Sequence, residues 1–279
     1  DAEIVLPSEI DGYIVQEIAD SAFEKNETLE KVILPETLER VGSGIFSGCT
    51  GLTYVGFGSR LTEIGNSMFS GCTSLKKISL PMGITSIKNH AFYNCTSLTE
   101  ISLPRTLKSI DYYAFYNCTG LQSIELPDSV TAISGYAFRN CTALTSVELP
   151  LSWETLQAGS SSYSDRSPFV GCSALTTIAL PDGMTRLPDY AFADCSQLES
   201  VILPGSLTEI GSSAFHGCTA LGQISLPETL SVIGSSAFDG CSALTDISIP
   251  GQVTEIQAYT FSGCTSLSEI TLPEELTTI

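Results

Sequence analysis

Cysteine is the residue type with the most varied chemistry in this 279-residue chain, and all 10 cysteines fall into one regular series. Successive cysteines are 23 residues apart, except for a single step of 31 residues. A zinc site needs ligands paired at about two to four residues, and His90 and His216 are the only histidines of the sequence. The series therefore predicts no metal centre. Its members are Cys49, Cys72, Cys95, Cys118, Cys141, Cys172, Cys195, Cys218, Cys241 and Cys264.

Disulfide bonds are the other chemistry open to this series. Adjacent repeats would bring the Cα atoms of two cysteines within bridging range. However, side chains stacked at equivalent positions point the same way, which fits the disulfide torsion poorly, and Asn26 holds the equivalent position in the first repeat. We therefore expect buried free thiols that fill space and cap backbone carbonyls.

Aromatic side chains gather in three successive repeats and could form a binding surface. One set lies two residues before a phenylalanine, and a second set follows the phenylalanine directly. We expect both sets to stack as an exposed ladder that offers aromatic faces to a sugar ring or a hydrophobic anchor, with an arginine as a bidentate donor. The predicted binding residues are His90, Tyr93, Tyr112, Tyr113, Tyr116, Tyr136 and Arg139.

A structural role is the alternative for these tyrosines. Tyrosine also stands two residues before phenylalanine at Tyr190 and Tyr259, outside the cluster. Tyrosine at this position is therefore also consistent with a residue that the repeat favours because it packs over a turn.

Catalysis is not expected from this sequence. It contains no nucleophile-elbow, phosphate-loop, zinc-protease or calcium-loop motif, and its polar residues recur with the repeat rather than cluster. Glu125 and Glu148 would lie one repeat apart, but two acids on a bare strand face are typical of solvated side chains. We predict no enzymatic activity and no cofactor.

The elements that position these residues follow from the repeat itself. A phenylalanine stands three residues before each cysteine and a leucine three residues after it, so a unit reads C-x-x-L-x-x-I-x-L-P-x-x-L-x-x-I-x-x-x-A-F-x-x. A fixed period in the twenties predicts a solenoid, in which each repeat forms one coil and buries its apolar side against its neighbours. The predicted structural ladder of the aromatic repeats is Phe92, Phe115, Phe138, Cys95, Cys118 and Cys141.

The alternation in I-x-L predicts a short strand that ends at the proline, and strands of successive coils should pair in parallel. The segment after the proline, L-x-x-I and then A-F, is consistent with either a second short strand or a helical turn. We thus predict about eleven 23-residue coils with short parallel strands and mostly irregular or short helical connections.

The repeat also sets the expected boundaries. Residues 1–22 form an N-terminal cap and the start of the first coil, with a hairpin as one option, and residues 23–279 form a single solenoid domain that stops partway through a repeat. Trp153 and Leu156 keep the apolar positions of their coil, so residues 157–168 are predicted to be an inserted loop. Such a loop either carries binding residues or is a serine-rich bulge without function.

The repeat pattern resembles the BspA-like leucine-rich repeats, a class first described from a treponemal repeat protein. The resemblance covers nearly the whole chain, and one unit shows it at Leu75, Ile78, Leu80, Pro81, Ile84, Ile87, Ala91, Phe92 and Cys95. It implies a curved right-handed solenoid, usually on secreted or surface-attached proteins of bacteria and some mucosal protozoa, used in adhesion. The family offers no ligand motif to transfer.

Charge narrows the range of partners. The net charge is −19, from 31 acidic and 12 basic residues, and no basic residue follows Arg186. Such a chain repels phosphate backbones and anionic lipids, so nucleic acid is not an expected partner, and no apolar run is long enough to insert into a membrane. The acidic C-terminal third could attract a basic partner, although solubility alone also explains it.

Together these observations predict an extracellular or cell-surface leucine-rich-repeat protein that binds a protein or glycan ligand, with host extracellular matrix as one candidate. The alternative is a structural spacer or a self-associating segment of a larger surface protein.

Overall fold

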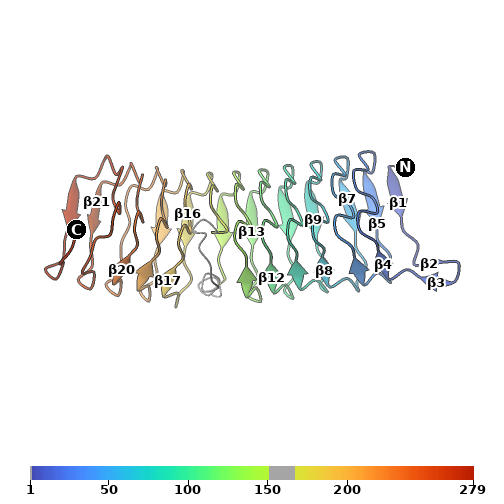
Figure 1. The fold of residues 1–279 in the computed structure, drawn as a ribbon, viewed down its shortest axis with the longest axis horizontal. Helices are drawn as coiled ribbons and strands as arrows, with labels where there is room; N and C mark the ends of the chain where they lie inside the picture. The colour runs from blue at the N-terminus through green and yellow to red at the C-terminus, as the bar shows by residue number, and fades with distance from the viewer. Residues whose placement is uncertain (1, 151–166) are drawn as a thin grey trace. The chain divides into compact units, whose positions relative to one another are not determined.

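The computed structural model describes residues 2–150 and 167–279, in which short strands and turns form successive coils and no helix occurs (Figure 1). The predicted solenoid of 23-residue coils is thereby confirmed, and its connections are turns rather than short helices. Trp153, Leu156 and all but the last two residues of the predicted inserted loop lie outside the described residues. Ser167 and Pro168 are buried, and Ser167 Oγ donates a hydrogen bond to the carbonyl of Ala191 at 2.9 Å.

Most coils begin with a three-residue strand; the coil around Ile224 has none at this position. The central side chain of this strand points inward and its neighbours point outward, as in β11, where Ile101 is buried between exposed Glu100 and Ser102. This is the alternation expected of a strand with one face on a core. The strands are β1 (Glu3–Val5), β5 (Lys31–Ile33), β7 (Tyr54–Gly56), β9 (Lys77–Ser79), β11 (Glu100–Ser102), β13 (Ser123–Glu125), β15 (Ser146–Glu148), β16 (Thr177–Ala179), β18 (Ser200–Ile202), β21 (Asp246–Ser248) and β22 (Glu269–Thr271).

A second, two-residue strand follows the proline-containing turn, which decides between the two structures that the sequence allowed for this segment. Its second residue is buried in most coils, as Ile110 is in β12. These strands are β4 (Glu17–Ile18), β6 (Arg40–Val41), β8 (Glu63–Ile64), β10 (Ser86–Ile87), β12 (Ser109–Ile110), β14 (Ala132–Ile133), β17 (Arg186–Leu187), β19 (Glu209–Ile210) and β20 (Val232–Ile233).

Both kinds of strand pair in parallel with the equivalent strand of an adjacent coil. Ile78 of β9 pairs with Ile101 of β11, and Ile87 of β10 pairs with Ile110 of β12. This register stacks identical positions, so every side chain belongs to a column of equivalent residues.

The core consists of such columns. Phe92, Phe115 and Phe138 are fully buried, and the rings of Phe92 and Phe115 stack with centroids 5.1 Å apart and planes 3° from parallel. Full burial of one such side chain contributes about 2–3 kcal/mol. The predicted phenylalanine ladder is therefore the structural centre of the coils.

By contact density the described chain forms two compact units, Asp1–Thr142 and Ala143–Ile279. The boundary between them lies close to the undescribed residues 151–166, and a single solenoid domain stays a prediction. The aromatic cluster from His90 to Arg139 lies wholly within the first unit.

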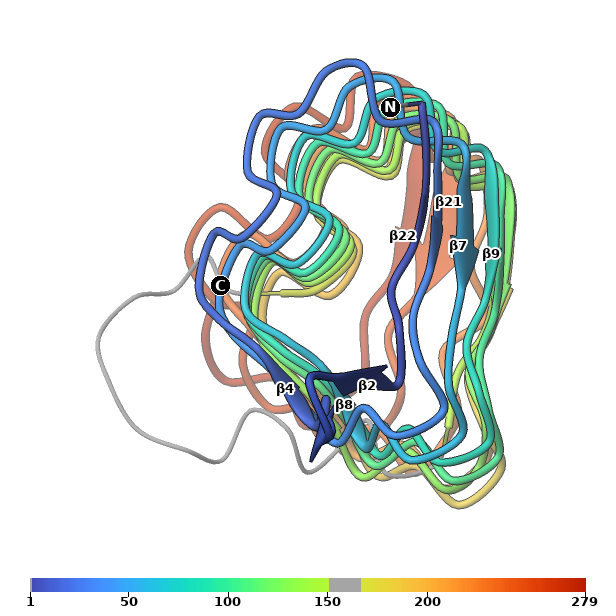
Figure 2. The same cartoon turned by 90° about the vertical axis from the view of Figure 1, so that its right-hand side faces the viewer.

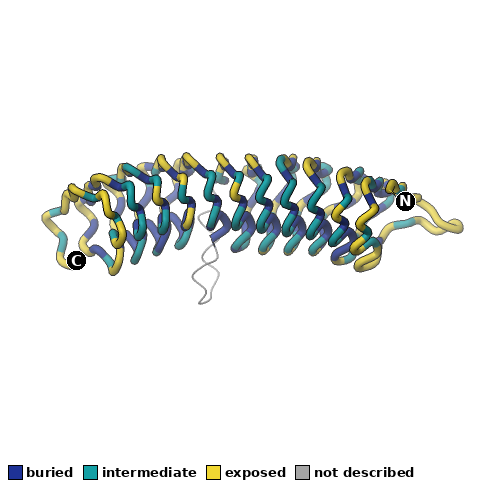
Figure 3. The backbone as a smooth tube through the Cα atoms, turned by 90° about the horizontal axis from the view of Figure 1, so that it is seen from above, coloured by how far each residue is buried: buried dark blue, intermediate teal, exposed yellow. Residues whose placement is uncertain are grey.

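The first unit begins with a hairpin, which was one of the structures expected for its N-terminal residues. Strands β2 (Glu9–Ile10) and β3 (Tyr13–Ile14) pair antiparallel and project away from the first coil at its lower edge (Figure 1 and Figure 2). Ile10, Tyr13 and Ile14 are 56%, 80% and 60% exposed, and Figure 3 shows the hairpin as an exposed segment. Its apolar side chains thus face solvent, and a cap formed by residues 1–22 stays a prediction.

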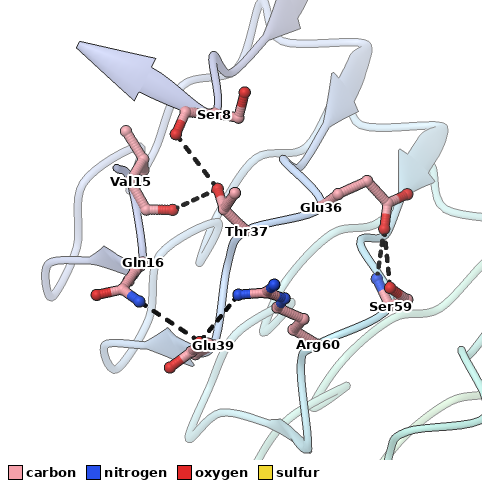
Figure 4. A network of polar contacts seen from close by, with 8 residues as sticks. All are labelled: Ser8, Val15, Gln16, Glu36, Thr37, Glu39, Ser59 and Arg60. Atoms are coloured by element: carbon pink, nitrogen blue, oxygen red, sulfur yellow. Dashed lines mark hydrogen bonds and ion pairs between the residues drawn. The ribbon is translucent and has the colours of Figure 1, made fainter. Parts of the chain in front are cut away.

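The base of the hairpin is held by the next coil through polar contacts (Figure 4). Thr37 Oγ1 donates to the carbonyl of Val15 at 2.7 Å and to that of Ser8 at 3.4 Å. Beyond it, the Glu36 carboxylate accepts hydrogen bonds from the amide and hydroxyl of Ser59, which lowers the pKa of Glu36. These contacts link three successive coils at their surface.

Candidate functional site

The candidate site is built on the turn that carries the buried phenylalanine. In Figure 2 this turn lies on the side of the coil away from the three-residue strands. The turn holds two residues with left-handed backbone conformation, one two residues before the phenylalanine and one two residues after it. Around Phe115 they are Tyr113, with φ 59°, and Asn117, with φ 58°.

The occupants of these two positions differ in how well they suit that conformation. The second position holds mainly glycine and asparagine, which adopt positive φ readily. The first position holds His90, Tyr113 and Tyr136 in the three aromatic coils. Tyrosine recurs there singly at Tyr190 and Tyr259, and the remaining coils have serine or glycine. A bulky residue at positive φ costs about 1–2 kcal/mol, so contacts of these rings must offset local strain.

Stacking along the column supplies such contacts. The rings of His90 and Tyr113 stack with centroids 4.9 Å apart, and those of Tyr113 and Tyr136 with centroids 5.0 Å apart. A second column follows the phenylalanines, where the rings of Tyr93 and Tyr116 stack at 5.1 Å. The predicted stacking is therefore confirmed in both columns.

The two columns also contact each other within each coil. His90 lies 5.3 Å from Tyr93, and Tyr113 lies 5.7 Å from Tyr116, both measured between ring centroids. In the third coil Arg139 Cζ lies 5.1 Å from the centre of the Tyr136 ring, a cation–π contact. The six side chains thus form a two-by-three array, which we call the aromatic array: His90, Tyr93, Tyr113, Tyr116, Tyr136 and Arg139.

Tyr112 is the seventh predicted residue and directly precedes Tyr113 of the array. Its side chain is 42% exposed, and its carbonyl accepts a hydrogen bond from the His90 amide at 3.1 Å. It therefore lies beside the array in the same turn.

One detail of the predicted surface needs correction. The sequence suggested that the ladder offers aromatic faces, but stacked rings cover each other's faces inside the array. Tyr113, which stacks on both sides, consequently presents its edge and hydroxyl, and Tyr116 has one face covered by Tyr93. Open faces belong to the rings at the start of the array, His90 and Tyr93, because the preceding coil has Ser67 and Ser70 at the equivalent positions.

Charge near the array is modest. Burial lowers the pKa of His90, so this ring is neutral at pH 7. Burial also raises the pKa of Asp111, an effect to which Glu63 adds and which Lys88 and a hydrogen bond from Ser109 oppose. At neutral pH, Arg139 therefore supplies the charge within the array itself.

Sequence reasoning missed one polar contribution. Asn94 and Asn117 occupy the second left-handed position of adjacent coils, and Asn117 Nδ2 donates to Asn94 Oδ1 at 2.9 Å. Their shared place in the 23-residue register was the signal that could have revealed the pair. The contact ties the aromatic coils together beside the array.

The cysteines confirm the expected thiol ladder. They are free, and each thiol resolved in the hydrogen-bond network donates to the carbonyl of a phenylalanine in the preceding coil, as Cys118 Sγ does to Phe92 at 3.1 Å. Cys95 and Cys141 make the same bond at 3.0 and 3.2 Å. Burial raises the pKa of Cys95 to about 12 and that of Cys264 to about 11. These thiols are therefore structural donors with little thiolate character.

Two further observations concern metal and membrane. The described residues contain no group of three or more His, Cys, Asp or Glu side chains placed to hold a metal ion. They also contain no helix that is long and apolar enough to cross a membrane.

Comparison with known proteins agrees with this architecture. The model of the BspA type leucine rich repeat region matches residues 16–145, 71–166 and 164–279. Because these matches cover most of the sequence, the chain belongs to the BspA-type leucine-rich-repeat family. A comparison with curated proteins finds no match.

Solved structures of bacterial proteins show the same fold. A leucine-rich repeat protein from Bacteroides ovatus is 26% identical, with a TM-score of 0.67, over 99% of this chain and 82% of that chain. A leucine rich cell surface protein from Faecalibacterium prausnitzii is 27% identical, with a TM-score of 0.51, over 97% and 87%. The pneumococcal vaccine antigen PcpA, at 22% identity and a TM-score of 0.53 over 99% and 70%, shares the fold.

Proposed function

We propose that this chain is a recognition module of an extracellular or cell-surface protein, and that its aromatic array binds a protein or glycan ligand, with host extracellular matrix as a candidate source. The observation that carries the proposal is the array itself. Tyrosine and histidine occupy strained left-handed positions in three successive coils, where their rings stack, whereas elsewhere in the column tyrosine occurs only singly, at Tyr190 and Tyr259, among serine and glycine. Strain of this kind clusters at functional sites.

A location at the cell surface is supported by similarity to a protein of known structure. The similar chain from F. prausnitzii is described as a cell surface protein. Membership of a repeat family whose coils present a long, regular surface also favours binding over catalysis.

The chemistry of the array suits recognition. Tyrosine combines a large apolar surface with a hydroxyl at low conformational cost, and arginine donates up to two parallel hydrogen bonds to a planar acceptor. These residue types are enriched at the energetic centres of binding interfaces.

The test is a triple substitution, Tyr113→Ser, Tyr116→Ser and Tyr136→Ser. Serine is native at both columns elsewhere, as at Ser67 and Ser70, so the coils should keep their fold. We expect binding to extracellular-matrix proteins or to a glycan array, measured by surface plasmon resonance, to be abolished with little change in melting temperature. Unchanged binding would remove the array from consideration.

A matched control uses Tyr190→Ser and Tyr259→Ser, which change the same column in coils of the second unit. These substitutions should leave binding intact. A structural spacer is the second candidate function; it predicts no saturable binding and concentration-dependent association in analytical ultracentrifugation.

A further inference from the structure

The start of the aromatic array borders a stretch of small residues on the two preceding coils of the first unit. Gly44 and Ser67 precede the array in the column of His90, and Ser47 and Ser70 precede it in the column of Tyr93. Parallel coils are about 4.8 Å apart, so this stretch is roughly 10 Å wide along the stack. We call it the shelf.

Aromatic rings form one wall of the shelf. His90 stacks on Tyr113 with planes 15° apart, and Tyr93 stacks on Tyr116 with planes 8° apart. Since one face of each ring is covered by the following coil, the opposite face is turned toward Ser67 and Ser70. The side chain of His90 is partly exposed and its ring is neutral at pH 7, so this wall is an uncharged aromatic surface.

The opposite wall is formed by the first coil. Glu24 and Lys25 lie there, with Lys25 Nζ 3.9 Å from Glu24 Oε1. The stem of Lys25 lies against Gly48, where an added Cβ atom would approach Lys25 Cγ to 3.1 Å. The first coil thus bounds the shelf in the column of Tyr93, through Glu24, whereas in the column of His90 it contributes the small residue Ser21.

The accessible floor consists of the partly exposed Ser47, Ser67 and Ser70, because Gly44 is buried. The backbone amides of Ser67 and Ser70 are used within the fold, donating to Asn89 and Ser67 at 2.9 and 3.0 Å. Among the residues that the structure describes, the hydroxyls of Ser47, Ser67 and Ser70 donate no hydrogen bond to another protein group. They are partly exposed and available to a ligand.

We propose that the shelf binds a neutral glycan, with a pyranose ring stacked on His90 and Tyr93 at the position that an aromatic side chain fills in the following coils. This inference rests on the proposed function of the aromatic array and names its ligand class. A pyranose has an apolar C–H face for the wall and hydroxyls that hydrogen-bond to the serine floor.

The same features disfavour other ligands. An aromatic side chain of a protein partner gains most of its binding energy in a closed apolar pocket, whereas the accessible floor here consists of serine. The net charge of −19 disfavours sulfated or phosphorylated glycans. A neutral sugar therefore fits the shelf best.

The test fills the shelf with the side chain that the repeat itself uses. In Ser67→Tyr with Ser70→Tyr, the new rings should extend both stacks, because φ is 52° at Ser67 and 59° at Tyr113. The probes are neutral glucan, galactan and mannan oligosaccharides of about two to six units, assayed by saturation-transfer NMR and calorimetry. The matched control is Ser236→Tyr, at the same column in the second unit, with φ 56°.

We expect at least one probe to bind the wild-type chain, and its affinity to fall at least about tenfold in the filled variant and in His90→Ala with Tyr93→Ala, while the control binds normally. An unchanged melting temperature shows that the filled variant is folded. Normal affinity of the filled variant overturns the proposal, as does failure of every probe to bind. The proposal is also overturned, in favour of a protein ligand, if only tyrosine-containing peptides bind the wild-type chain and the filled variant no longer binds them.

These outcomes separate the shelf from the array. If matrix proteins bind the wild type and lose affinity in the Tyr113, Tyr116 and Tyr136 variant but not in the filled variant, the proposed function stands and the shelf proposal fails. If the filled variant alone loses an oligosaccharide, the shelf stands and the tyrosines of the array are not its contact surface.

Discussion

The cysteine thiols show how one residue type serves a repeat at a single atomic contact. Buried Sγ atoms donate to carbonyls of the preceding coil, at 3.1 Å for Cys118 and Phe92. A serine would also donate, but a thiol fills more apolar volume and loses less on leaving water. The contact therefore satisfies a buried carbonyl in a column that is otherwise apolar.

The raised pKa values of these thiols predict lower stability in alkali. Below the unfolded pKa of about 8.5 both states are protonated, and as pH rises above it the unfolded thiols ionise while the folded thiols hold their protons. Each buried thiol should then reduce the free energy of unfolding by about 1.4 kcal/mol per pH unit, until pH reaches its folded pKa, about 12 for Cys95. Urea unfolding between pH 8 and pH 10.5 measures this slope.

The control for that experiment is Cys118→Ala, which removes one thiol. The free energy of unfolding of this variant should fall less steeply with pH, by the contribution of one thiol. An identical slope in both proteins would show that the thiols do not govern alkaline stability. Thiol titration of denatured protein without reductant should return the 10 cysteines as free thiols, and fewer than eight would indicate disulfides.

At the scale of the element, each coil depends on its neighbours. A strand of two or three residues is too short to be stable alone, so its stability comes from pairing and from the columns of buried side chains. Phe115 lies between Phe92 and Phe138, with centroids 5.1 Å away on both sides. Phe261 has Phe238 on one side at 5.7 Å and is only partly buried.

Phe115→Ala should therefore destabilise its unit more than Phe261→Ala does. Removing a fully buried phenylalanine costs about 3–5 kcal/mol, because apolar contact is lost and a cavity is left between two coil interfaces. At Phe261 the cost should be clearly smaller, because the ring is partly exposed. Chemical unfolding of the two variants measures the effect of the same substitution at two positions of one column. Equal losses in the free energy of unfolding would contradict a core built from columns of stacked side chains.

For the whole molecule, charge is the dominant property. The net charge is −19, and the stretch from Leu187 to Ile279 holds 11 acidic residues and no lysine or arginine. Ion pairs of the described residues lie at the surface, as between Lys77 and Glu100, which are 72% and 63% exposed at 2.6 Å. Such exposed pairs contribute little, so repulsion among the carboxylates should outweigh them.

We therefore expect the melting temperature to rise as sodium chloride is increased from about 0.05 M to about 0.5 M, because salt screens repulsion between exposed charges. Differential scanning calorimetry measures the change. A fall over this range would mean that the surface ion pairs stabilise the fold more than the excess negative charge destabilises it.

The sequence by itself determined the period, the phenylalanine and cysteine columns and the family. These follow from local rules applied at each repeat, since Phe115 and Cys118 must face inward wherever the unit closes one coil. The same register predicted which rings of the aromatic array would be neighbours, because residues 23 positions apart stack in successive coils.

Only the tertiary structure decided which surfaces those rings leave open and whether the second segment is a strand. Burial of the faces of Tyr113 depends on its neighbours in both adjacent coils, and the left-handed φ at Tyr113 depends on how the whole turn closes. The hairpin was likewise foreseen as an element, whereas the exposure of Tyr13 depends on where the following coils hold its base. Column membership is a property of spacing along the chain, but an open face is a property of what packs against it.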